Sequence, residues 1–356
     1  MHEQVVAVTG ASSGVGRAIA QATGQRGAKV ALLARNEEGL QAAAREIEQR
    51  GGAALICSVD VADAAAVERA ATAIEQRWGR IDTWVNCAML TVFARVMDTS
   101  PEEFRRVTET SYLGYVHGTQ AALRHMLPHD EGLIIQIGSA LAYRSIPLQS
   151  AYCGAKAAIR GFTDALRCEL IHDGSHVQLS HLQAPAVNTP QATRQRNKME
   201  RQQQPIPPMF TPESIADVVL WVATQDHAPR EMLIGLPTMK AVWGQLALRL
   251  LGAAGLLDRY LATAAWDTQF VDVPDQQQGR DILWHTLPGD PGAHGPYRDR
   301  ERGPDVQMRL RTLPRLTAVR DLAAAVVLAA RTTANVSAWW ASATKPPGCL
   351  RRASTM

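Results

Sequence analysis

The first residues constrain the fold most strongly, because they place a glycine-rich turn between an expected strand and an expected helix. Residues 4–9 form an apolar run typical of a buried parallel strand, and a helical sequence starts near residue 15. The glycines at this junction permit a tight turn and a close approach of a diphosphate to the backbone. We therefore predict a nucleotide-binding cradle. Its expected members are Gly10, Ser12, Ser13, Gly14, Val15 and Gly16.

The first 235 residues alternate between strand-like and helix-like sequence. Strands are expected near residues 4–9, 29–34, 54–59, 81–86, 132–138, 177–183 and 231–235. Helices are expected near residues 15–26, 36–50, 63–78, 101–126, 151–171 and 212–225. This alternation predicts an α/β fold, a Rossmann-type doubly wound parallel sheet of about seven strands with helices on both faces. In such folds the ligand binds at the carboxyl ends of the strands.

The end of the second expected strand indicates which dinucleotide the cradle binds. An NAD site usually has an acidic residue there, which binds the ribose 2′-hydroxyl. This chain has Ala34 at that position, followed by Arg35. Because a guanidinium matches a 2′-phosphate, and because Ser13 and Asn36 offer further hydrogen bonds, we predict NADP(H) rather than NAD(H). The alternative for Arg35 is an ordinary solvated loop charge.

A tyrosine and a lysine on one expected helix indicate acid–base chemistry. Tyr152 and Lys156 are four residues apart and therefore share a helix face. A cation at ~4 Å and an effective dielectric of ~20 favours the tyrosinate by roughly 4 kcal/mol. That is about three pKa units, which would bring Tyr152 near pH 7 before desolvation opposes the shift. The hydroxyl of Ser139 can donate to a substrate oxygen as charge develops there. The alternative is a surface Tyr and Lys on an ordinary helix.

Taken together, these motifs resemble the short-chain dehydrogenase/reductase family over about residues 9–235. The matching residues are Thr9, Gly10, Gly14, Gly16, Asp60, Val61, Asn86, Ala88, Ser139, Tyr152, Lys156, Pro185 and Thr189. The resemblance implies that Tyr152 donates the proton in carbonyl reduction and that Lys156 also holds the nicotinamide ribose. It further implies that Asp60 and Val61 contact the adenine and that Asn86 and Ala88 border the adenosine ribose. The resemblance places Pro185, Val187 and Thr189 at the cofactor as well, with Thr189 at the carboxamide.

Three positions depart from the family pattern. Met89 replaces a glycine after the fourth strand, which puts a large side chain beside the cofactor or the substrate. Ser111 stands where many members carry an active-site Asn, which orders water in a proton relay to the lysine. We therefore include Ser111 as a candidate relay residue. Ala186 replaces the usual glycine after Pro185, a mild change unless that position requires a positive φ.

Bulk composition favours a globular protein with a real core and reduced thiols. The net charge of +3 is too small to indicate a nucleic-acid partner. Five cysteines without a C-x-x-C pattern favour reduced thiols in a cytoplasmic protein, and the histidine spacing predicts no metal site. No signal peptide is expected before the first strand. The resemblance also implies a homo-oligomer, either a dimer or a tetramer.

The remaining sequence extends well beyond the compact family fold. We expect residues 1–240 to form the catalytic domain, with a polar, proline-containing lid at 190–212 over the substrate; the alternative for the lid is a solvated loop. Residues 241–341 are expected to pack on the core or at a subunit interface, with an irregular linker or wrapping arm at 271–305 and a last helix near 317–341. The alternative for the apolar segments is peripheral membrane contact. Residues 342–356 are expected to be disordered.

The sequence therefore predicts an NADP(H)-dependent oxidoreductase that interconverts a carbonyl and an alcohol. The lid residues Met199, Met209 and Phe210 suggest that the substrate is apolar. Two alternatives remain open. One is a noncatalytic NADP(H)-binding regulator or scaffold, which Ser111, Met89 and the extension would fit. The other is an epimerase-like or dehydratase member that uses the same Tyr/Lys pair.

Overall fold

The computed structural model describes residues 1–275 and 279–312. The helix expected near 317–341 and the disorder expected at 342–356 both lie outside these described residues. Residues Met1–Met308 form one compact unit, so residues 241–308 belong to the same unit as the sheet.

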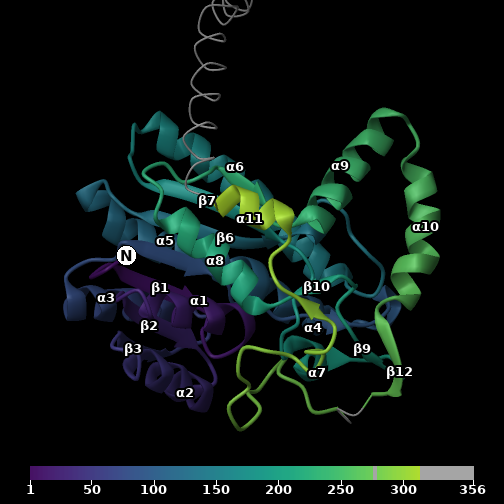
Figure 1. The fold of residues 1–356 in the computed structure, drawn as a ribbon, viewed down its shortest axis with the longest axis horizontal. Helices are drawn as coiled ribbons and strands as arrows, with labels where there is room; N and C mark the ends of the chain where they lie inside the picture. Colours follow the sequence, from purple (N-terminus) through teal and green to yellow (C-terminus); the bar gives the residue numbers. More distant parts are fainter. Residues whose placement is uncertain (276–278, 313–356) are drawn as a thin grey trace, which may run out of the picture. The chain divides into compact units, whose positions relative to one another are not determined.

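Seven parallel strands form the central sheet (Figure 1). In spatial order they are β11 (Glu231–Leu233), β7 (Gln178–Ala184), β6 (Leu133–Ser139), β4 (Thr83–Asn86), β1 (Val5–Thr9), β2 (Lys29–Ala34) and β3 (Ala53–Ser58). The spatial order reverses direction at β1 and β4, where doubly wound sheets bind their ligands. The expected doubly wound parallel sheet is therefore confirmed.

Six helices cover the two faces of the sheet and build a core on each. One face carries α1 (Gly14–Gly24), α2 (Glu37–Glu48) and α8 (Pro212–Ala223). The other carries α3 (Ala64–Trp78), α5 (Gly114–Met126) and α6 (Ser150–His172). Successive residues of β1 point to opposite faces, so Val6 and Val8 enter the first core while Val5 and Ala7 enter the second. A strand buried on both faces must be apolar throughout, which explains the apolar run at the N-terminus.

The helix expected over 101–126 is interrupted by a π-helical turn. It consists of α4 (Pro101–Thr108), the π-helical turn η2 (Glu109–Leu113) and α5. Ser100 begins α4 with a reciprocal capping box to Glu103. Ser111 lies within the π-helical turn, so the interruption falls at a predicted site residue.

The segment expected as a lid contains short ordered elements that pair with other parts of the chain. Its elements are α7 (Gln191–Arg194), β8 (Arg196–Asn197), β9 (Arg201–Gln203) and β10 (Met209–Phe210). They pair, in turn, as β8 with β5 (Val92–Phe93), β9 with β12 (Phe270–Pro274) and β10 with β13 (Glu301–Arg302). Two of these three pairings use strands beyond residue 241, so the extension holds the lid segment in place.

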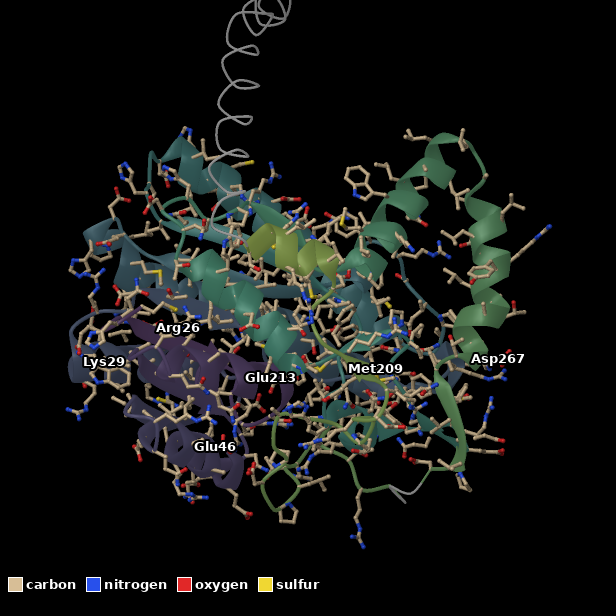
Figure 2. The ribbon with its side chains drawn as sticks, viewed as in Figure 1. Arg26, Lys29, Glu46, Met209, Glu213 and Asp267 are labelled. Atoms are coloured by element: carbon tan, nitrogen blue, oxygen red, sulfur yellow. The ribbon has the colours of Figure 1, made fainter. Side chains whose placement is uncertain are left out.

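The described extension begins as a helical hairpin and continues as a mainly irregular arm. The hairpin consists of α9 (Leu236–Leu250) and α10 (Ala254–Asp267), and Figure 2 shows its side chains as far as Asp267. Several of its large apolar side chains are exposed, among them Trp243 and Leu256. Among the residues that the structure describes, none of the helices has both the length and the apolarity needed to cross a bilayer. The remaining short elements are η1 (Val96–Asp98), η3 (Leu127–His129), η4 (Ala140–Ala142) and α11 (Val306–Thr312).

Candidate active site

A cavity of about 490 Å³ lies at the carboxyl edge of the sheet, where the site was predicted. Seventeen of the predicted site residues line it: Gly10, Ser12, Ser13, Gly14, Val15, Gly16, Arg35, Asn36, Asp60, Val61, Ala88, Ser139, Tyr152, Lys156, Pro185, Val187 and Thr189. The side chains of the two remaining residues, Asn86 and Ser111, are directed elsewhere, as described below. Met89, the replacement for a glycine, also lines the cavity.

The glycine cradle is shaped by close backbone contacts that exclude side chains. Gly10 has φ +73, and a Cβ there would lie 2.9 Å from the Cα of Ala88. A Cβ at Gly16 would lie 2.3 Å from the carbonyl oxygen of Gly10. Ser13 is the N-cap residue of α1, yet its hydroxyl makes no capping hydrogen bond. The cradle therefore offers the start of α1, with its partial positive charge, and a serine hydroxyl to an anion in the cavity.

Arg35 and Asp60 line the end of the cavity at β2 and β3, and Arg106 forms an ion pair with Asp60 there. Arg35 follows β2, and Asp60 accepts hydrogen bonds from Arg106 and from the backbone of Ala62. Burial opposes the charge of Asp60, but the hydrogen bonds and charge of Arg106 hold the pKa of Asp60 below its usual range. With Asp60 ionised, the three side chains carry a net charge of +1, so this end favours an anion. Arg106 was not among the predicted site residues, because a lone arginine on a helix gives no local signal of this contact.

Ser139, Tyr152 and Lys156 meet on the cavity wall. Ser139 ends β6, and its hydroxyl is hydrogen-bonded to the phenol of Tyr152. The Ser139 N–H donates to Oε1 of Gln183 at 2.9 Å, which fixes the start of this turn. The ammonium of Lys156 lies 5.6 Å from the centre of the Tyr152 ring. The structure thus brings together the three residues that the spacing pointed to.

The pKa of Tyr152 differs from the value near 7 expected from the sequence. Burial raises the pKa of Tyr152 above its ordinary value, although the hydrogen bond from Ser139 opposes this shift. Burial also lowers the pKa of Lys156 to about 8. The expectation assumed a cation at about 4 Å in a partly solvated site. In the structure both groups are buried, and loss of hydration outweighs their mutual attraction.

The direct polar partner of Lys156 is a second tyrosine, Tyr115, which sequence reasoning missed. Nζ of Lys156 donates to the Tyr115 hydroxyl at 2.9 Å and to the carbonyl of Ile137 at 2.7 Å. The Tyr115 hydroxyl in turn donates to the same carbonyl at 2.9 Å. Tyr115 is 1% exposed and Lys156 is 2% exposed, so this triangle is closed to solvent.

Ser111 and Asn86 have structural partners instead of facing the cavity. The Ser111 hydroxyl accepts from the N–H of Leu90 and donates to its carbonyl, both at 2.7 Å. It thereby fixes the loop after β4. Asn86 is fully buried, and its side chain bonds Trp84, Thr119 and Gln136. The amide of Asn86 is thus turned into the core, and the expectation that Asn86 borders the adenosine ribose stays a prediction for its backbone.

Asn36 has a further partner that the sequence did not indicate. Its Oδ1 caps α2 by accepting from Gly39, and its Nδ2 donates to the carbonyl of Leu287 at 2.8 Å. Its amide is thus directed to the C-terminal arm. Among the residues that the structure describes, no cluster of three or more His, Cys, Asp or Glu side chains is arranged to hold a metal ion.

Comparisons with known proteins agree with this geometry. A family model described as short chain dehydrogenase matches residues 4–200. The uncharacterized oxidoreductase YxnA of Bacillus subtilis (strain 168) is 31% identical over 288 residues, which cover 80% of this chain and 78% of YxnA. The aligned length exceeds residues 1–240, so the similarity includes part of the extension.

Two solved structures have the same fold as this chain and are moderately similar to it in sequence. An alcohol dehydrogenase from the archaeon Thermococcus sibiricus, complexed with 5-hydroxy-NADP, is 28% identical with a TM-score of 0.57, covering 65% of this chain and 96% of its own. A metagenomic short-chain oxidoreductase in complex with NADP is 29% identical with a TM-score of 0.56, covering 66% of this chain and 97% of its own. The sequence match and the shared fold show that this chain is an oxidoreductase of the short-chain dehydrogenase/reductase family.

Proposed function

We propose that this enzyme interconverts a carbonyl and an alcohol with NADP(H) as the hydride carrier. The observation that carries the proposal is the position of Ser139, Tyr152 and Lys156 on one wall of the cavity whose other end is the glycine cradle. A hydroxyl, a phenol and an ammonium are thereby placed beside a site shaped for a diphosphate.

The residues present fit a phosphorylated dinucleotide. The lack of a side chain at Gly10 and Gly16 lets the backbone of the cradle pack tightly, against Ala88 and against the Gly10 carbonyl, as a turn that holds a diphosphate requires. Ser13 has a hydroxyl that is not used for capping α1, and Arg35 and Arg106 outnumber Asp60 at the end expected for the adenosine. The net positive charge there supports NADP(H) over NAD(H), because a 2′-phosphate adds negative charge at that end.

The mechanism assigns a distinct role to each side chain. When bound, the nicotinamide supplies or accepts the hydride. Ser139 donates a hydrogen bond to the substrate oxygen and orients Tyr152, which delivers the proton to that oxygen. Lys156, charged below its pKa of about 8, stabilises the tyrosinate left after proton transfer. Tyr115 and the Ile137 carbonyl hold the ammonium in this position.

The substrate end of the cavity supports an apolar carbonyl compound. Its wall includes Leu141, Ile146, Ile206, Pro207, Ala241 and Leu261. These side chains come from η4, the loop between η4 and α6, the lid segment and the α9–α10 hairpin. Desolvation of apolar groups by this wall favours binding by about 25 cal/mol per Å² of buried area.

The Tyr152→Phe variant tests the proposed function. A panel of carbonyl and alcohol substrates is followed at the nicotinamide absorbance with each of the four cofactor forms, and products are identified. Because removal of a general acid costs about 10²–10⁴-fold in rate, turnover should nearly vanish while NADPH binding persists. Turnover retained by Tyr152→Phe would contradict the mechanism, and NADPH binding without turnover of any substrate would favour a noncatalytic role.

The Arg35→Ala variant tests the proposed cofactor preference. Loss of a charge-assisted hydrogen bond worth about 1.5–3 kcal/mol should raise the Kd of NADPH by roughly 10- to 100-fold. The Kd of NADH, which lacks the 2′-phosphate, should change much less. Equal weakening of both cofactors would contradict the assignment of Arg35 to the 2′-phosphate.

A further inference from the structure

An arm formed by residues 281–297 contributes to the wall of the cavity. Ile282, Thr286, Leu287 and Pro291 of this arm line the same cavity as the glycine cradle. The arm lies outside the region that the family model matches, which ends at residue 200. The wrapping arm expected within 271–305 is therefore placed at the predicted cofactor site.

The first part of the arm is joined to the adenosine end of the site. Arg35 donates to the carbonyl of Ile282 at 2.6 Å, and Arg106 donates to the carbonyl of Leu283 at 3.0 Å. Leu283 is 1% exposed and packs in an apolar cluster with Leu90 and other residues of the loop after β4. Arg35, which lines the cavity, and Arg106, which pairs with Asp60, therefore both contact the arm.

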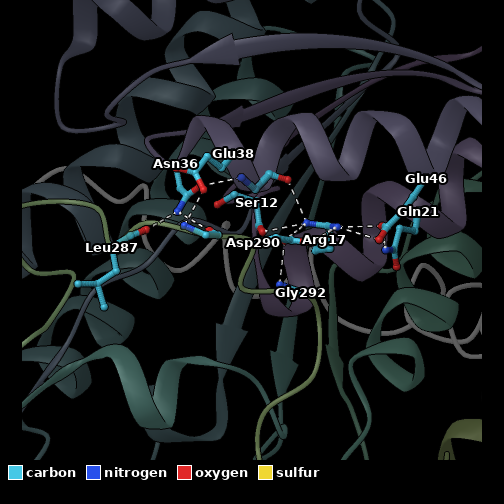
Figure 3. Close-up of polar contacts among 11 residues, drawn as sticks. Ser12, Arg17, Gln21, Asn36, Glu38, Glu46, Leu287, Asp290 and Gly292 are labelled. Atoms are coloured by element: carbon cyan, nitrogen blue, oxygen red, sulfur yellow. Dashed lines mark hydrogen bonds and ion pairs between the residues drawn. The ribbon is translucent and has the colours of Figure 1, made fainter.

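The middle of the arm is joined to the cradle helix α1, as Figure 3 shows. Arg17, one residue after the last glycine of the cradle, has a fully buried side chain. It forms ion pairs with Asp290 of the arm at 2.9 Å and with Glu46 of α2 at 2.8 Å. Gly14, at the first turn of α1, donates its N–H to the carbonyl of Gly292 at 3.1 Å.

The last part of the arm is joined to the loop after β7. The N–H of Gly295 donates to the carbonyl of Asn188 at 3.2 Å. A Cβ at Gly295 would lie 2.4 Å from both Oδ1 of Asn188 and the carbonyl oxygen of Thr189. Tyr297 closes this end by donating its hydroxyl to the carbonyl of Gln203 at 2.7 Å. The arm thus contacts cavity-lining residues both after β2 and after β7, and a side chain at Gly295 would clash with the loop after β7.

We infer that residues 281–297 are part of the dinucleotide site and retain the adenosine-diphosphate half of the bound cofactor. The inference rests on the proposed dinucleotide binding but not on turnover. The arm is hydrogen-bonded to Arg35 after β2, to α1 and to the loop after β7. A dinucleotide bound between the cradle and the arm therefore dissociates at a rate that is set by the opening of these contacts. The cofactor class is a dinucleotide whose diphosphate faces the start of α1.

Two carboxylates on the same arginine provide a matched pair of variants. Asp290→Asn removes the anion of the arm from Arg17, whereas Glu46→Gln removes the anion of α2 from the same guanidinium. Gly295→Ala displaces the other end of the arm, and Gly303→Ala, where a Cβ meets nothing within 4 Å, is its control. NADPH and NADH serve as probes, and their dissociation is followed by stopped-flow fluorescence after mixing with excess oxidised dinucleotide.

The expected result is at least fivefold faster NADPH dissociation in Asp290→Asn and in Gly295→Ala. Glu46→Gln and Gly303→Ala should stay within twofold of the unchanged protein, with all five proteins folded by circular dichroism. Equal dissociation rates in all five would overturn the inference. Equal acceleration in Asp290→Asn and Glu46→Gln, without an effect of Gly295→Ala, would also overturn it, because helix α1 rather than the arm would then be responsible. The measurement uses no carbonyl substrate, so failure of the proposed reaction is seen separately, as absence of turnover.

Discussion

At the residue scale, the buried triangle of Lys156, Tyr115 and the Ile137 carbonyl determines the charge of the active-site lysine. The titratable groups near the ammonium are Tyr115, Tyr152, Cys87 and His181. Burial raises the pKa of the Cys87 thiol to about 12 and lowers the pKa of His181 to about 3. Both are therefore neutral across the working pH range, and Lys156 titrates without a charged neighbour among these groups.

The pH profile of carbonyl reduction follows from the same pKa values. Below about pH 8, Lys156 is charged and Tyr152, whose pKa burial raises, is protonated, so both are in the form that reduction requires. As the pH rises through about 8, Lys156 loses its proton and its support for the tyrosinate. We expect kcat for reduction to be constant from pH 6 to 7 and to fall above pH 8. A constant kcat up to pH 10 would contradict this assignment.

Tyr115→Phe tests whether the second tyrosine positions the lysine. The change keeps the ring but removes the hydroxyl that accepts a hydrogen bond from the ammonium, worth about 1.5–3 kcal/mol. We expect kcat to fall about tenfold and its basic limb to move about one unit towards lower pH, because the charged lysine loses an acceptor. Tyr143→Phe removes a phenol bonded to Glu231 outside the cavity and serves as the control. A loss of thermal stability with an unmoved pH limb would indicate a merely structural role.

The sequence predicted the position of some site residues correctly and gave no indication of others. Ser139, Tyr152 and Lys156 were found because strand ends and a four-residue helical spacing place them on one edge of the sheet. Tyr115 lies 41 positions before Lys156, and nothing in the sequence around Tyr115 indicates its contact with the lysine. Asn86 was expected at the cofactor from the family resemblance, but a matching motif after a strand does not determine whether a side chain turns outward or inward. The direction depends on partners such as Trp84 that belong to the folded core.

At the element scale, α5 approaches β4 closely enough that one position must be glycine. A Cβ at Gly118 would lie 2.2 Å from Oδ1 of Asn86 and 2.8 Å from Nε1 of Trp84. We expect Gly118→Ala to lower the free energy of unfolding by about 1–3 kcal/mol, as overpacking of a core does. Gly161→Ala on α6, where a Cβ meets nothing within 4 Å, should raise it by about 0.5–1 kcal/mol through helix propensity. Urea unfolding measures both, and a stable Gly118→Ala variant would show that this approach can relax.

The elements that the sequence located well are those with strong periodicity. The seven strands and the helices on both faces were expected within a few residues of their observed bounds. The π-helical turn within 101–126 was not expected; in the structure its Ser111 contacts Leu90, a partner that is distant in sequence. The short lid strands were also missed, since their partners, including β12 and β13, are distant in sequence.

At the scale of the whole molecule, the extension adds an apolar surface to the family fold. Leu250 is 79% exposed and Leu251 is 77% exposed, both at the end of α9. Trp243 and Leu256 are exposed on the same hairpin, which also contributes Leu261 to the cavity wall. The sequence predicted the apolar content of this region but not which side chains face outward, since that depends on how α9 and α10 pack.

We predict that a second copy of the chain covers this hairpin, as expected for residues 241–341 at a subunit interface. Each leucine buried there would contribute about 1.5–3 kcal/mol, and a buried unpaired carboxylate would oppose association. Leu250→Asp combined with Leu256→Asp should therefore weaken dimerisation at least tenfold by analytical ultracentrifugation of the full chain. Ile171→Asp, at an exposed apolar position on α6, is the control and should leave association unchanged. If the unchanged chain sediments as a monomer and instead binds lipid vesicles through these leucines, peripheral membrane contact replaces the subunit interface.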